Sequence, residues 1–172
     1  MRAPGLILTC TTVVLLAGCA GYHLGPVNSG GAAGRARTIE VIPFNNQTLQ
    51  PRLGDAVTQA LRERLQADGT YRLATRSGGN IVVTGVVTRY SREGLSYLNT
   101  DVATVENYRV GVTAHVTARD RSTGKLLLDK NVKGYTLVHV GTDLASAERQ
   151  SLPLLAEDLA RNTVELLTEG AW

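Results

Sequence analysis

Between residues 107 and 119, apolar and polar side chains alternate, and this pattern constrains the fold more than any other feature of the chain. The even-numbered positions are apolar, from Tyr108 to Ala118, and the odd-numbered positions are polar apart from Gly111. Successive side chains of a β-strand point to opposite faces of a sheet. The segment therefore predicts a strand with one buried face and one wet face. Helices are expected over the even-numbered residues, and the odd-numbered face is left to water or a partner.

The next segment predicts a hairpin. Arg121-Ser122-Thr123-Gly124-Lys125 fits a three-residue loop closed by Arg121 and Lys125, with Gly124 in the left-handed conformation. This pairing sets apolar residues opposite apolar ones, and a shift by one residue would destroy the match. The predicted pairs are Ala118 with Leu128, Ala114 with Val132, Thr117 with Asp129, and Thr113 with Lys133.

The residues before this hairpin carry strand and helix patterns. Leu53, Val57, Leu61 and Leu65 recur every four residues and predict an amphipathic helix, which Gly69 ends. The other expected segments are a strand over residues 38–44 that ends near Pro43, a polar loop over 45–50, a short strand over 71–74, a central strand over 80–90 and a polar loop over 91–104.

A final helix is expected after Asp143, with an apolar stripe that runs from Leu152 to Leu167. Pro153 leaves two alternatives: Ser151 caps a new helix, or the helix kinks. All these elements together predict an α+β fold. Its architecture is a two-layer sandwich, with two helices packed on one face of a mostly antiparallel four- to five-stranded sheet, in the order β-α-β-β-β-β-α.

The N-terminus has the pattern of a bacterial lipoprotein signal peptide. Arg2 precedes an apolar run that closes on Leu16-Ala17-Gly18-Cys19. The run is shorter than the ~20 helical residues that span a membrane. We expect cleavage before Cys19, which then carries the lipid; an ordinary secretory signal with a chance cysteine is the alternative. Ala20 favours the outer membrane, because an Asp there would hold a lipoprotein at the inner membrane.

This interpretation divides the chain into three parts. Residues 1–18 are the signal peptide, residues 19–37 are a lipidated flexible tether, and residues 38–172 are a single α+β domain. The tether prediction rests on the run Gly30-Gly31-Ala32-Ala33-Gly34, whose small residues favour flexibility.

Composition and motifs argue against an enzyme. No two of the three histidines have a metal-ligand spacing, and no nucleophile, phosphate-loop or dinucleotide motif is present. Cys10 leaves with the signal and Cys19 is acylated, so the mature domain has no disulfide and no cysteine metal site. The formal net charge of +3 and the aromatic content of 5% are too low for a dedicated nucleic-acid binder. We expect no catalytic residue, no metal and no cofactor.

Basic residues are the candidates for a binding site. Two end the 80–90 strand and four belong to the last hairpin. Clusters of Arg and Lys bind phosphate groups, and the abundant phosphorylated ligand of an outer membrane is the lipid A of lipopolysaccharide. The alternative is a solvated basic face that serves solubility. The candidates are Arg89, Arg92, Arg119, Arg121, Lys125 and Lys133.

Motifs in a fixed order along the mature chain resemble the LptE family of lipopolysaccharide-assembly lipoproteins, in its divergent form outside the enteric bacteria. The resemblance rests on the order of the motifs together with the lipoprotein signal. The motifs are Cys19-Ala20-Gly21-Tyr22-His23-Leu24, residues 39–48, Leu61-Arg62-Glu63-Arg64-Leu65, Gly85-Val86-Val87, Ser96-Tyr97, Tyr108-Arg109-Val110, residues 119–125, and Ala156-Glu157-Asp158-Leu159-Ala160.

The resemblance implies a lipoprotein of the outer membrane, seated on the periplasmic side or within the lumen of the β-barrel LptD. It would aid assembly of that barrel, plug its lumen, help deliver lipopolysaccharide to the outer leaflet, and bind lipopolysaccharide itself. Val41-Ile42-Pro43-Phe44-Asn45-Asn46 is also similar to CsgG-like curli-secretion lipoproteins and to the N-terminal domain of TolB. The alternative function is therefore a lipoprotein subunit of another envelope machine.

Overall fold

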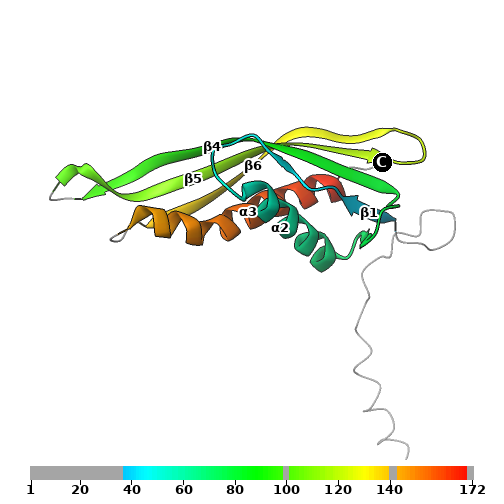
Figure 1. Ribbon diagram of the computed structural model, residues 1–172, viewed down its shortest axis with the longest axis horizontal. Coiled ribbons are helices and arrows are strands. Elements are labelled where there is room, and N and C mark those ends of the chain that lie inside the picture. Colours follow the sequence, from blue (N-terminus) through cyan, green and yellow to red (C-terminus); the bar gives the residue numbers. More distant parts are fainter. Residues whose placement is uncertain (1–36, 99–100, 140–142, 170–172) are drawn as a thin grey trace, which may run out of the picture. The chain divides into compact units, whose positions relative to one another are not determined.

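The computed structural model describes residues 37–98, 101–139 and 143–169. These residues form one sheet and two helices (Figure 1). In chain order the elements are β1 (Thr38–Val41), β2 (Asn45–Asn46), α2 (Leu53–Asp68), β3 (Arg72–Leu73), β4 (Ile81–Leu98), β5 (Asp101–Asp120), β6 (Leu126–His139) and α3 (Leu144–Glu169).

The sheet has six strands, in the order β3-β1-β4-β5-β6, with β2 paired to β4 beyond β1. β4, β5 and β6 form an antiparallel run. β1 pairs in parallel with β3 and with β4, and β2 pairs in parallel with β4. Both helices pack on one face (Figure 1). The predicted α+β sandwich is confirmed, and the strand count rises from four or five to six because residues 38–46 make two short strands on either side of Pro43.

The predicted register of the last hairpin is confirmed. Ala118 pairs with Leu128, and Ala114 pairs with Val132. Gly124 has a φ of 69°, in the left-handed region. The loop is one residue longer than expected, because a bulge between Ala118 and Arg119 shifts the pairing and Asp120 N–H donates to the Lys125 carbonyl.

The expected polar loop over residues 91–104 is wrong. β4 continues to Leu98 and β5 begins at Asp101, so most of this segment is paired strand. The prediction failed because Arg89, Ser91 and Glu93 of this half of β4 are exposed, and a strand that buries little need not show apolar alternation. Figure 1 shows this end of the hairpin extending past the start of α3.

The core lies between the helices and the even-numbered face of β5, whose residues from Val110 to Ala118 are at most 1% exposed. The stripe of α2 is buried as predicted, and Gly69 ends the helix at a φ of 76°. Asp143 caps α3 by accepting from Ala145 N–H at 3.0 Å. α3 runs through Pro153 as one helix, and the Ser151 hydroxyl donates to the Glu148 carbonyl, so Ser151 does not begin a new helix.

Candidate interaction site

One face of the sheet carries no helix. We call it the open face: it holds the odd-numbered residues of β5 and lies away from α2 and α3. At its centre, His115 contacts Asn131 Oδ1 through Nδ1 at 3.1 Å and Asp129 Oδ1 through Nε2 at 2.9 Å. These polar groups bond to one another across β5 and β6, which makes the centre of the open face polar.

Two of the predicted basic residues meet on the open face. Arg89 of β4 and Lys133 of β6 both pair with Thr113 of β5, one from each side. Their Cα atoms are therefore about 10 Å apart, two strand spacings. Both residues are exposed. A group with several phosphate oxygens can accept from both side chains at this separation.

Three other predicted basic residues lie at the far end of the hairpin. Arg119 pairs with Val82, and Arg121 and Lys125 flank the turn. Arg119 is six positions along β5 from Thr113, or ~20 Å at the rise of a strand. The structure therefore places Lys133 away from Arg119, Arg121 and Lys125. The predicted single cluster on the last hairpin is divided between the turn end and the position of Lys133.

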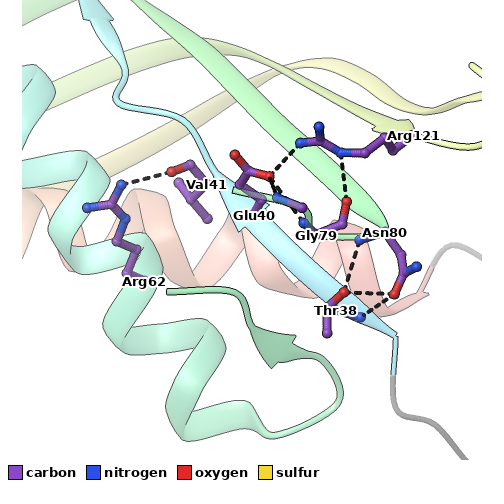
Figure 2. Close-up of polar contacts among 8 residues, drawn as sticks. Thr38, Glu40, Val41, Arg62, Gly79, Asn80 and Arg121 are labelled. Atoms are coloured by element: carbon purple, nitrogen blue, oxygen red, sulfur yellow. Dashed lines mark hydrogen bonds and ion pairs between the residues drawn. The ribbon is translucent and has the colours of Figure 1, made fainter. Parts of the chain in front are cut away.

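Arg121 is engaged in a structural contact. Its Nη2 lies 2.5 Å from Glu40 Oε2, and its Nε donates to the Gly79 carbonyl at 3.0 Å (Figure 2). Gly78 N–H and Gly79 N–H donate to the same Glu40 oxygen, at 2.9 and 3.2 Å. These bonds join β1, the loop before β4 and the last hairpin. Arg121 is therefore committed to holding three segments together.

Glu40 is 9% exposed, and its Oε2 accepts the hydrogen bonds from Gly78, Gly79 and Arg121 described above. The Gly78 N–H, followed by the Gly79 N–H and the Arg121 guanidinium, holds the pKa of the Glu40 carboxyl below its usual value against the opposing effect of burial. Gly79 has no room for a side chain, since a Cβ there would lie 2.7 Å from Glu40 Cβ. Sequence reasoning missed Glu40; the available signal was a single carboxylate between two apolar residues of a short strand.

Arg92 lies on the helix side of the sheet, where its Nη1 contacts Glu148 Oε1 of α3 at 3.0 Å. It also lines a pocket of ≈ 630 Å³ beside β4. The neighbouring Tyr90 hydroxyl is buried and has no hydrogen-bond partner among the described residues, and burial raises its pKa. The pocket is lined by Gln47, Thr48, Leu49, Gln50, Thr88, Arg89, Tyr90, Arg92 and Glu148.

Apolar side chains are also exposed on the part of the sheet that leads toward the tip of the β4–β5 hairpin. Tyr135 and Leu137 of β6 are 48% and 67% exposed on the open face, and Leu95 of β4 is 42% exposed. Tyr135 packs over Gly111, where a Cβ would lie 3.2 Å from its ring. The open face is thus polar at its centre and partly apolar toward the tip, a composition found at protein interfaces.

The structure gives less information on the predicted lipid anchor, on metal sites and on membrane spans. Cys19 lies outside the described residues. Among residues 37–98, 101–139 and 143–169, no group of three His, Cys, Asp or Glu side chains is placed to hold a metal ion. Neither of the two helices in the described part combines the length and hydropathy needed to cross a membrane.

A six-stranded sheet with one face covered by two helices and one face open defines an α+β two-layer sandwich. Residues 36–167 match the family model described as "LptE: Lipopolysaccharide-assembly". Because this match spans most of the chain, the protein belongs to the LptE family. The resemblance seen in the sequence is confirmed, and the role of the family is lipopolysaccharide assembly, which is not an enzymatic activity.

Solved structures share the fold. The hypothetical protein CT253 from Chlamydia trachomatis is 9% identical, with a TM-score of 0.57, over 79% of this chain and 98% of that chain. A minor lipoprotein from Acinetobacter baumannii is 14% identical, with a TM-score of 0.50, over 77% of this chain and 93% of that chain. At these identities the likeness concerns the fold alone. No curated protein matches the sequence.

Proposed function

We propose that this chain is an outer-membrane lipoprotein, anchored through Cys19, that partners the β-barrel LptD as plug and assembly factor in lipopolysaccharide transport to the outer leaflet. The family match over residues 36–167 carries the proposal. The open face supports it, because its centre of Thr113, His115 and Thr117 is suited to a hydrated barrel lumen. The partly apolar region toward the tip offers a surface for direct contact with the barrel wall.

Purification of the tagged full-length lipoprotein in mild detergent tests the partnership. We expect a stable one-to-one complex with a barrel of the LptD kind. A homo-oligomeric ring without a barrel would overturn this function and favour the CsgG-like alternative. A soluble periplasmic complex without a barrel would favour the TolB-like alternative.

We also propose that the open face binds lipopolysaccharide phosphates through Arg89 and Lys133. The remaining candidates are less suited: Arg92 lies on the helix side of the sheet and Glu40 holds Arg121, whereas Arg119 and Lys125 lie at the turn end. Each charge-assisted contact contributes ~1.5–3 kcal/mol. The double variant Arg89→Glu, Lys133→Glu should therefore weaken lipopolysaccharide binding at least about tenfold and change its salt dependence.

The matched control is Arg64→Glu, Lys130→Glu, which makes the same charge change at exposed positions away from the open face. Binding of labelled lipopolysaccharide by both double variants, at two salt concentrations, decides the question. If both variants bind as the parent protein does, the basic residues serve solubility, and the protein acts as plug and assembly partner without a phosphate site of its own.

A further inference from the structure

The second half of β4 is an unpaired edge of the sheet. β1 and β2 pair only with its first half, up to Val87, and the last backbone bond on that side runs from Gln47 N–H to the Val87 carbonyl at 3.0 Å. From Arg89 to Leu98, β4 pairs with β5 on one side, and no described residue pairs with it on the other. Figure 1 shows this half of β4 along the rim of the sheet.

The opposite edge of the sheet is capped by α3 around residues 133–135 of β6. Asp158 of α3 accepts from Tyr135 N–H of β6 at 2.9 Å, and Asn162 Nδ2 donates to the Lys133 carbonyl at 2.8 Å. α3 also packs so tightly there that a Cβ at Gly134 would lie 2.6 Å from the Leu159 nitrogen. Side chains that bond an edge strand prevent it from pairing with another chain. The two long edges therefore differ: β6 is capped around residues 133–135, and the second half of β4 is available.

The pocket described above lies beside the available edge. Thr88, Tyr90 and Arg92 of β4 line it from the sheet, and Glu148 lines it from α3. A strand added along β4 would direct alternate side chains to the helix side, toward this pocket. The ionised lining residues are Arg89, Arg92 and Glu148, so their charge is +1 and one carboxylate would balance it.

We propose that an extended, acidic segment of the barrel partner adds to the sheet along β4 between Arg89 and Leu98, with one of its carboxylates in the pocket beside Arg92. This inference rests on the proposed partnership and names the contact that makes it. Backbone hydrogen bonds to the edge would give affinity, and the charged pocket would select the acidic segment.

Hydrogen exchange of the co-purified complex, compared with the lipoprotein alone, tests the added strand. Alternate amides between residues 89 and 98 should exchange more slowly in the complex by an order of magnitude or more, because a paired strand bonds every second residue. Amides of β6 from 133 to 135 should change little. If the complex forms without slower exchange in β4, this inference is overturned and the partnership stands; if no complex forms, both fail.

Photo-crosslinking from the pocket identifies the occupant. A photoreactive residue at Arg92 should link to an acidic segment of the barrel, and one at Arg64 on α2 should not. Links from Arg92 to residues 19–36, or to a second copy of this chain, would overturn the proposal. Gln47→Glu in the pocket should reduce the yield of complex at least threefold by repelling the carboxylate, while Gln66→Glu, exposed on α2, leaves it unchanged.

Discussion

Individual residues of the hairpin turn serve geometry more than binding. Arg121 lies 81 residues from Glu40 in the sequence, and their contact fixes the hairpin end against β1. Asp120 accepts from Ser122 N–H at 2.9 Å and Thr123 N–H at 3.0 Å, and so closes the turn from within. The turn that carries these basic residues is therefore held by a local network that includes two carboxylates with lowered pKa values.

Acid should weaken the turn through Asp120. The Ser122 hydroxyl, with the Thr123 N–H, lowers the pKa of Asp120 from 3.8 to about 2. A lowered folded-state pKa contributes stability that is complete above pH 4 and is lost as the pH falls toward 2. Asp120→Ala should therefore lower Tm at pH 7, and its difference from the parent should shrink between pH 4 and 2. Thermal unfolding across this range checks it, with Glu165→Ala on α3 as the control; a constant difference would contradict it.

Gly124 tests the backbone of the same turn. Its φ of 69° disfavours a β-branched residue, so Gly124→Val should reduce the free energy of unfolding by ~1–2 kcal/mol. Gly124→Asn should lose less, because asparagine tolerates the left-handed region. Urea denaturation of both variants measures the difference. Equal losses would show that the cost does not come from the backbone conformation.

At the element scale, the seam between α3 and β6 combines close packing with edge capping. Gly134→Ala would place a methyl group 2.6 Å from the Leu159 nitrogen, so α3 must move away. Overpacking of this kind costs ~1–3 kcal/mol. We expect a matching loss of unfolding free energy and faster hydrogen exchange at Tyr135, whereas exposed Lys130→Ala should change stability by less than ~0.5 kcal/mol. Parent-like exchange at Tyr135 would show that the cap survives without the close approach.

The sequence predicted those strands and helices in which apolar residues face the core and polar residues face water. The β5–β6 register followed from alternation because one face is core and the other is water. The placement of Arg92 could not follow, because the bulge between Val87 and Arg89 reverses which residues of β4 face the helices. The unpaired residue Thr88 thus places Arg89 on the open face and Arg92 beside Glu148, the reverse of strict alternation from Val87, and no sequence pattern marks it.

At the scale of the whole molecule, the anchor is tested by Cys19→Ala. If Cys19 is the acylation site, the variant should be uncleaved or unlipidated and should leave the membrane fraction. Mass spectrometry of the mature N-terminus decides it for the parent protein. A peptide that begins anywhere other than at a diacylglyceryl-modified Cys19 would contradict the anchor, and Cys10→Ala, within the expected signal, is the matched control.

The hydrogen bonds from Asp158 and Asn162 to β6 set a limit on assembly. A sheet with two bare rims can polymerise, since every copy that joins exposes a fresh rim for the next. Because α3 caps β6 around residues 133–135, a further strand is hindered on that side, and the second half of β4 is the more accessible edge. Capping of one edge therefore favours a finite complex over an open-ended fibre.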